Sequence, residues 1–161
     1  MSMYYNIGDK IVYPMHGAGI IEAIEEKEIL GVKRKYYIMK MPLDDMRVMI
    51  PLDTIDGIGI RQVITQEEVQ QVIQVLEADE TNMPQNWNRR YRANMDRLKT
   101  GDIFEVAEVV KNLVLRDREK SLSTGERKIL NNARQILLSE IILATDMSEE
   151  EVLATMERAI K

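Results

Sequence analysis

The chain has 161 residues, of which 45% are hydrophobic and 30% charged, and its formal net charge is −5 at pH 7. This composition is ordinary for a globular protein and supplies apolar material for one large domain or two small ones. The chain has no cysteine and a single histidine, His16, which excludes disulfides and thiolate chemistry and argues against a zinc site of nitrogen and sulfur ligands.

The first sixty residues alternate in hydrophobicity and turn often, which is typical of short strands in a small, strongly bent antiparallel sheet or barrel. Pro14 stops the first strand, Gly31 lies in a hairpin turn, and Asp44–Asp45 form another turn in preference to a cation site, because Asp is a common turn residue. Gly17–Gly19 predicts either a turn or a close approach of two backbones. Residues 57–60 are expected to form an exit segment, and the strands are expected at 10–13, 20–24, 27–30, 35–39 and 47–50.

From Thr65 onward the apolar residues recur at helical spacing. Asn86 and Asp102 are expected to cap two helices, the first of which runs to about residue 99. Three further helix starts carry the capping-box pattern, namely Thr65 with Glu68, Ser123 with Glu126, and Ser148 with Glu151. The sequence therefore predicts an α+β protein, in which residues 1–63 form a small antiparallel β-module and residues 64–161 form a compact all-helical domain of four or five helices.

The polar break at 78–84 is expected to be a linker, on which the angle between the two domains would depend.

The only tryptophan, Trp87, lies among arginines in the segment Asn86-Trp87-Asn88-Arg89-Arg90-Tyr91-Arg92. Residues 84–139 carry twelve basic and seven acidic side chains, whereas the segments before and after them are acidic. This local reversal of charge favours a nucleic-acid surface, because arginine binds phosphate and an aromatic ring stacks on or wedges against bases. The alternative is that Trp87 packs under a helix whose arginines form a solvated face. Since the whole chain is acidic, its hold on DNA is expected to be weak and to need a second anchor.

Motifs for other functions are missing from the sequence. It contains no G-x-x-x-x-G-K, G-x-G-x-x-G or G-x-S-x-G pattern, and His16 has no Ser or Asp nearby and is assigned to a turn. We expect no enzyme activity, no cofactor and no metal. Met1–Tyr5 lacks the features of a signal peptide, and no apolar run approaches the roughly 20 residues that span a bilayer. A cytoplasmic protein without a membrane partner is therefore expected.

Several segments together resemble one known family. Gly8-Asp9-Lys10-Ile11-Val12-Tyr13-Pro14-Met15-His16-Gly17-Ala18-Gly19 resembles the opening motif of the CarD/CdnL family of bacterial transcription factors. The segment from Asn86 to Asn94 resembles the DNA-binding motif of that family, and residues 107–117 and 122–128 resemble its later helices. The resemblance covers essentially the whole chain in the same order.

The resemblance implies a Tudor-like RNA polymerase interaction domain at the N-terminus and a helical domain that contacts promoter DNA. Family members bind the RNA polymerase β subunit and stabilise the open promoter complex. The tryptophan of the family corresponds to Trp87 and acts as a minor-groove wedge at the upstream edge of the melted region. Because a wedge need not read bases, DNA binding is expected to be largely sequence-independent, and the family resemblance implies a monomer.

The expected DNA-binding residues follow from this motif and from a later helix start. Arg89 and Arg92 lie three apart on one helix face and are expected to hold phosphates, with Arg90 in the same surface. Arg127 and Lys128 are secondary candidates, because a helix N-terminus itself favours phosphate.

Tyr91 follows Trp87 by four residues and is expected to support the indole from the core side, with Met95 and Leu98 continuing that stripe.

The expected polymerase-binding residues are Lys27, Arg47, Met49 and Pro51. Met49 stands where family members can carry arginine, and Arg47, two residues away on the same strand face, is a candidate substitute. Pro51 either belongs to the contact surface or only terminates the strand. A protein–protein adaptor that uses the β-module without DNA contact stays open as an alternative, and a small enzyme would require a deep polar pocket.

Overall fold

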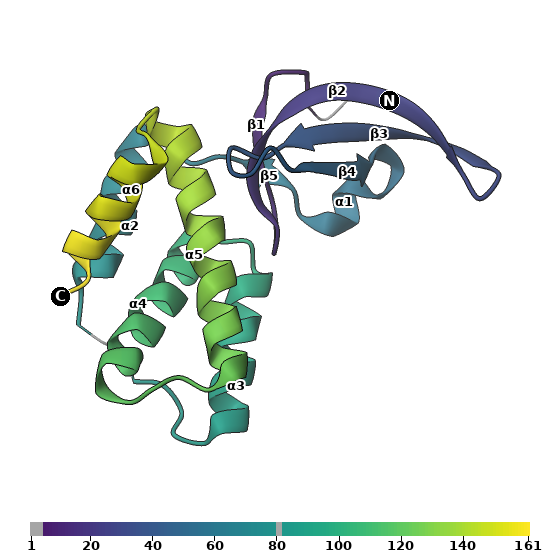
Figure 1. The fold of residues 1–161 in the computed structure, drawn as a ribbon. Coiled ribbons are helices and arrows are strands. Elements are labelled where there is room, and N and C mark those ends of the chain that lie inside the picture. Colours follow the sequence, from purple (N-terminus) through teal and green to yellow (C-terminus); the bar gives the residue numbers. More distant parts are fainter. Residues whose placement is uncertain (1–4, 80–81) are drawn as a thin grey trace.

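A five-stranded antiparallel sheet stands at one end of a group of five long helices in the computed structural model, which describes residues 5–79 and 82–161 (Figure 1). The strand order is β4-β3-β2-β1-β5. The predicted α+β class is therefore confirmed, while most of the N-terminal segment Met1–Tyr5 lies outside the described residues. The strands are β1 (Lys10–Tyr13), β2 (Gly17–Ile29), β3 (Val32–Lys40), β4 (Arg47–Pro51) and β5 (Arg61–Gln62).

Strand β2 is one long strand where the sequence predicts two short ones. Its register with β3 shifts between Ile21 and Ala23, and such a bulge bends a strand and interrupts its alternation of inward and outward residues. Of the two readings of Gly17–Gly19, the close backbone approach is correct. A Cβ atom at Gly19 would lie only 2.7 Å from the carbonyl oxygen of Lys40, so the strand needs glycine there.

The segment after β4 is more ordered than the expected exit segment. A short 3-10 helix, η1 (Leu52–Thr54), leads into α1 (Ile55–Ile58), which ends at Gly59 in the left-handed conformation with φ of 83°. The chain then forms β5, where Arg61 pairs with Val12 of β1. Two residues carry no periodicity, which is why the sequence does not reveal this strand.

The helices begin where their predicted caps lie. The side chains of Thr65, Asn86, Asp102, Ser123 and Ser148 each accept a hydrogen bond from a backbone N–H in the first turn of the helix that follows. The reciprocal capping box is complete at Thr65 and Ser148, whereas the Glu126 side chain at the start of α5 turns elsewhere. The helices are α2 (Gln66–Glu77), α3 (Trp87–Lys99), α4 (Ile103–Glu119), α5 (Thr124–Thr145) and α6 (Glu149–Ala159).

The predicted linker at 78–84 does not separate the two domains. Helix α2 precedes it and packs against α4, α5 and α6, with Val69, Val72 and Leu76 in the helical core. The break therefore joins two helices of one domain, and the expectation that it sets the interdomain angle is wrong because the apolar face of α2 is already buried there. Residues 80 and 81 of this segment lie outside the described residues.

Arg61 of β5 fastens the sheet to the helices. Its guanidinium donates to both carboxylate oxygens of Glu140 on α5, at 2.7 and 2.8 Å, and to the carbonyl oxygen of Gly101 at 2.8 Å. The Glu140 carboxylate also accepts a hydrogen bond from the backbone N–H of Ile64 at 2.9 Å. One side chain thus ties the last strand to α5 and to the turn between α3 and α4.

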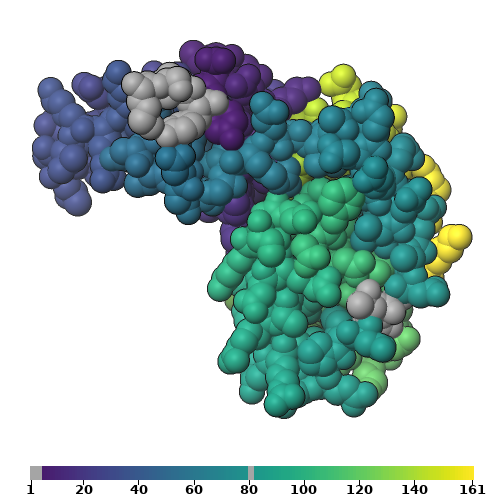
Figure 2. All heavy atoms as spheres, turned by 180° about the vertical axis from the view of Figure 1, so that it is seen from behind, coloured from purple at the N-terminus to yellow at the C-terminus, as the bar shows by residue number. Residues whose placement is uncertain are grey.

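Two further hydrogen bonds join β-strands to the same end of α5. The Ala18 N–H donates to Ser139 Oγ, and Lys10 Nζ donates to the carbonyl oxygen of Leu143, both at 2.9 Å. Ala18 and Leu143 also bury apolar surface together with Val12. Seen from behind, the sheet projects from the helical domain as an arm (Figure 2). The base of this arm is therefore held by polar and apolar contacts to one helix.

Candidate nucleic-acid interface

Trp87 is the first residue of α3. Helix α3 begins at the end of the helical domain that lies away from the sheet, near the start of α5 (Figure 1). Trp87 is 42% exposed. The indole stacks on the Tyr91 ring with a centroid distance of 5.2 Å and an interplanar angle of 27°. Tyr91 therefore supports the indole as predicted, and Met95 and Leu98 continue the packed stripe toward the helical core. Trp87 is neither a core residue nor a free surface side chain.

The start of α5 holds the indole from a second side. Trp87 Nε1 donates a hydrogen bond to Ser123 Oγ at 2.9 Å. A Cβ atom at Gly125 would lie 3.3 Å from the Tyr91 ring and 3.4 Å from the Trp87 ring, so glycine leaves room for the stacked pair. The indole is thus fixed by one ring contact and one hydrogen bond while part of its surface faces solvent.

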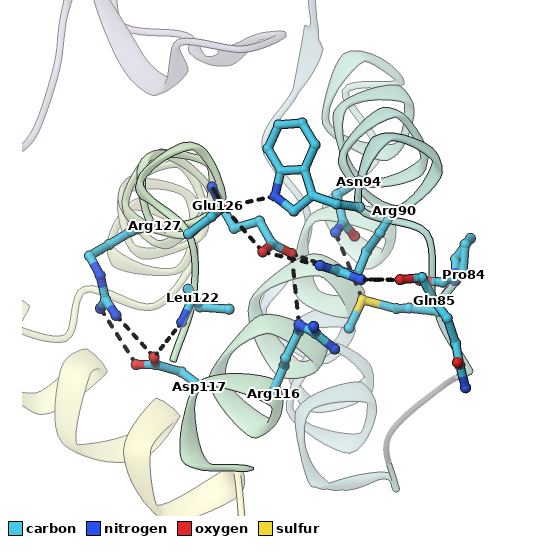
Figure 3. A network of polar contacts seen from close by, with 12 residues as sticks. Pro84, Gln85, Arg90, Asn94, Arg116, Asp117, Leu122, Glu126 and Arg127 are labelled. Atoms are coloured by element: carbon cyan, nitrogen blue, oxygen red, sulfur yellow. Dashed lines mark hydrogen bonds and ion pairs between the residues drawn. The ribbon is translucent and has the colours of Figure 1, made fainter. Parts of the chain in front are cut away.

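Arg90 does not belong to the expected DNA surface. Its side chain is only 4% exposed, and its Nε donates to the buried Glu126 carboxylate at 2.6 Å (Figure 3). Position 90 shares a helix face with Asn94 and Leu98, which are also buried, so the helix turns Arg90 inward. The structure thus removes Arg90 from the predicted DNA-binding surface, because charge alone does not tell which face of a helix is buried.

The other expected DNA-binding side chains are exposed. Arg89 and Arg92 lie on the surface of α3, and neither guanidinium is paired within residues 5–79 and 82–161. Lys128 is exposed in the second turn of α5. Arg127 is exposed as well but binds Asp117 at 3.0 Å, and its hydrogen bond is the main cause of the lowered pKa of that carboxyl. Three cations are therefore free for phosphate, and a fourth is partly neutralised.

The sequence does not single out Ser123 and Glu126 as residues that serve the tryptophan. Burial acts to raise the pKa of Glu126, but the hydrogen bond and charge of Arg90, together with hydrogen bonds from Ser123, outweigh burial and lower it. The only signal in the sequence is the capping-box pattern, which two other helices share. The residues around Ser123 do not show that Glu126, unlike the glutamates of the other two capping boxes, binds an arginine of a different helix.

The edge strand β4 gathers three of the four expected polymerase-binding residues. Arg47, Met49 and Pro51 are two residues apart along β4 and therefore point to the same face of the strand. In the described sheet, β4 is hydrogen-bonded to β3. Met49 is 39% exposed. Arg47 donates to both carboxylate oxygens of Glu22, at 2.6 and 3.0 Å, so it is engaged within the chain.

Lys27 stands apart from this group on the hairpin of β2 and β3, where it pairs with Arg34 in the sheet register and lies 3.4 Å from Glu25. The position is exposed but beyond the end of β4, whose last residue, Pro51, pairs with Tyr36.

The lone histidine, possible metal sites and possible membrane-spanning helices bear on other classes of function. The exposed His16 packs its ring against Tyr13 with a centroid distance of 4.3 Å. In residues 5–79 and 82–161, no group of three His, Cys, Asp or Glu side chains is arranged to hold a metal ion. Within the same described ranges, no helix has the length and apolar character needed to cross a membrane.

Known proteins resemble both halves of the chain. Residues 5–64 match the family described as CarD-like/TRCF RID domain, and residues 71–157 match the family described as CarD, C-terminal domain. The chain is 43% identical over 148 residues to the protein named "Putative transcription factor YdeB" of Bacillus subtilis (strain 168). The aligned region covers 92% of this chain and 97% of that protein.

Two solved N-terminal domains from Myxococcus xanthus are also similar. The solution NMR structure of the 72-residue N-terminal domain of CarD is 34% identical, with a TM-score of 0.33, over 38% of this chain and 83% of that one. The structure of CdnLNt is 33% identical, with a TM-score of 0.34, over 41% of this chain and 93% of that one.

Proposed function

This chain belongs to the CarD/CdnL family of transcription factors, and we propose that it binds the β subunit of RNA polymerase and stabilises the open promoter complex at the upstream edge of the bubble. The observation that carries the proposal is the half-exposed Trp87 indole, held rigidly at the tip of the helical domain beside unpaired arginines. A fixed aromatic surface next to free cations suits a junction of paired and melted DNA.

The polymerase contact is assigned to the N-terminal domain, residues 1–63, and mainly to β4. An edge strand can pair its free backbone groups with a strand of a partner protein, while alternate side chains provide specificity. Met49 and Pro51 supply apolar surface on this strand, and Arg47 supplies charge once it exchanges Glu22 for a partner carboxylate. Lys27 forms an outlying contact on the hairpin.

The DNA contact is assigned to the helical domain, residues 64–161. Trp87 wedges into the minor groove, and Arg89, Arg92 and Lys128 hold phosphates around it, with Arg127 as a weaker contact because of Asp117. Stacking of a base on an aromatic ring contributes about 1–3 kcal/mol, which corresponds to roughly fivefold to 150-fold in an equilibrium. Phosphate contacts carry no sequence information, so the protein acts at many promoters.

The acidic net charge of −5 explains why both contacts are needed. A protein with so little positive charge binds DNA weakly by itself, and docking on polymerase raises its effective concentration at the promoter. The protein accordingly acts at promoters already occupied by polymerase. The monomer is what the family resemblance implies, and a cytoplasmic location is part of the same proposal.

Replacement of Trp87 by Ala tests the proposal. The lifetime of open complexes formed by purified polymerase should fall by about fivefold or more, because the stacked ring is lost. Binding to polymerase without DNA and the urea unfolding midpoint serve as controls and should change little. An unchanged open-complex lifetime would overturn the DNA role and favour an adaptor that uses the sheet alone.

A further inference from the structure

We propose that Ser123, Glu126 and Arg90 form a positioning chain that sets the orientation of the Trp87 indole, and that this orientation is part of its effect on the promoter. The inference rests on the proposed function. None of the three side chains needs to touch DNA, so all three are positioning residues. They act by holding the ring at one angle before DNA arrives.

The Ser123 hydroxyl has no hydrogen-bonding capacity left over. Its oxygen accepts from Trp87 Nε1 at 2.9 Å and from the Glu126 backbone N–H at 3.2 Å, and its proton is donated to Glu126 Oε1 at 3.2 Å. A hydroxyl group has one proton and two lone pairs, so these three bonds define its orientation completely. The lone pair that receives the indole N–H therefore points in a set direction.

Arg90 in turn holds the Glu126 carboxylate. Its Nε donates to Oε2 at 2.6 Å and its second terminal nitrogen donates to Oε1 at 3.3 Å, in a site where both side chains are buried (Figure 3). The remaining terminal nitrogen donates to the carbonyl oxygens of Pro84 and Gln85 at 3.4 and 3.0 Å, in the segment that leads into α3. One guanidinium thus fixes both the acceptor of the indole and the backbone that carries it.

The other two capping boxes show that this use of Glu126 is not required for a helix start. At α2 and α6, the glutamates Glu68 and Glu151 accept from the backbone N–H of Thr65 and Ser148, at 3.0 and 3.2 Å. The N-cap hydroxyl donates to this glutamate at α2 as well as at α5, but at α5 the carboxylate binds Arg90 of α3 in place of the N-cap backbone N–H. Of these three capping boxes, the one without the reciprocal backbone bond is the one whose residues contact Trp87.

Ser123→Gly and Ser123→Thr separate positioning from helix capping. Glycine is a nearly equivalent N-cap, but it removes the acceptor of the indole. Threonine keeps both the cap and the hydroxyl. Ser148→Gly makes the same change at a capping box far from Trp87 and is the matched control.

Trp87 is the only tryptophan, so its fluorescence anisotropy reports on the ring directly. Ser123→Gly should lower the anisotropy and shorten the open-complex lifetime by about two- to tenfold, as expected for one neutral hydrogen bond. Ser123→Thr and Ser148→Gly should match the unaltered protein in both measurements. Glu126→Gln, which keeps an acceptor oxygen but loses the charge that holds Arg90, should give a smaller decrease in both.

The outcomes separate this inference from the proposed function. If Trp87→Ala shortens the lifetime and Ser123→Gly leaves both anisotropy and lifetime unchanged, the positioning chain is wrong while the DNA role stands. A fall in anisotropy without any change of lifetime likewise overturns the claim that orientation matters. If Trp87→Ala itself has no effect on the lifetime, the proposed function fails first.

Discussion

The two ends of α5 each bury a carboxylate against an arginine from elsewhere in the chain, yet the two pairs differ in burial and in what they join. Glu126 in the first turn meets Arg90 of α3, and the two side chains are 2% and 4% exposed. Glu140 is fully buried, but its partner Arg61 comes from the sheet and is 30% exposed. The first pair organises one end of the helical domain, and the second joins two domains.

Helix α5 sets the relative placement of the two proposed contact surfaces. The two glutamates are fourteen residues apart, about 21 Å along a helix that rises 1.5 Å per residue. The sheet is attached at one end of this rod and Trp87 at the other. If the sheet docks on polymerase as proposed, one continuous helix joins that docked domain to Trp87.

Breaking the more deeply buried pair should have the largest effect. Arg90→Met leaves the Glu126 charge without its main partner, which costs about 3–5 kcal/mol of unfolding free energy for a buried ion pair. Urea unfolding followed by circular dichroism measures this loss. Arg89→Met, at the exposed neighbouring position, is the matched control and should change the unfolding free energy little. Equal effects at the two positions would show that the pair is not buried as described.

The domain junction should respond less, because Arg61 can regain water when its partner is altered. Glu140→Gln weakens the hydrogen bonds to Arg61 and should cost about 1–3 kcal/mol of unfolding free energy. Small-angle scattering should show a wider range of interdomain arrangements, and Trp87 anisotropy should stay unchanged. Glu149→Gln, on the surface of α6, is the control. A change in Trp87 anisotropy would contradict the independence of the two ends.

The ion pair of Glu126 and Arg90 should make the unfolding free energy depend on pH. Glu126→Gln removes the charge of this pair and nearly keeps the shape of the side chain. The pKa of Glu126 is lowered from its ordinary value of 4.5, so its contribution is complete above that pH and is lost as the pH falls through the lower, folded-state value. The unfolding free energies of the unaltered protein and of Glu126→Gln should therefore begin to converge as the pH falls below about 4.5 and meet below the folded-state pKa of Glu126. A constant difference across that range would exclude the ionised pair as the cause.

The exposed ion pair of Arg47 and Glu22 should affect the unfolding free energy least. These side chains are 49% and 36% exposed, and solvent-exposed pairs contribute little to stability. Glu22→Gln should leave the unfolding midpoint unchanged and release Arg47, which should tighten binding to purified polymerase by less than about fivefold. Glu150→Gln changes the net charge equally on α6 and should have no effect on binding. Weaker binding of Glu22→Gln would mean that Glu22 itself contacts polymerase.

The helix starts could be predicted because their signals are local. Thr65, Asn86, Asp102, Ser123 and Ser148 bond to backbone groups within three residues, and each is recognised by its residue type and spacing. Tyr91 could be placed beside Trp87 for the same reason, since residues four apart on a helix are neighbours. The sequence divides the long strand β2 into two, because residues 25–29 are all exposed and show no alternation, and it does not reveal β5, because two residues are too few to show a period.

The sequence by itself thus determined the order of the β-module and the helical domain, the helix caps and the place of Tyr91 beside Trp87. Only the tertiary structure decided that Arg90 turns inward, that Ser123 receives the indole, and that Arg61 ties β5 to α5. Those contacts join residues 36 and 79 positions apart. No local pattern encodes such pairs. The packing of all the helices together decides which face of α3 is buried and which side chains at the start of α5 meet it.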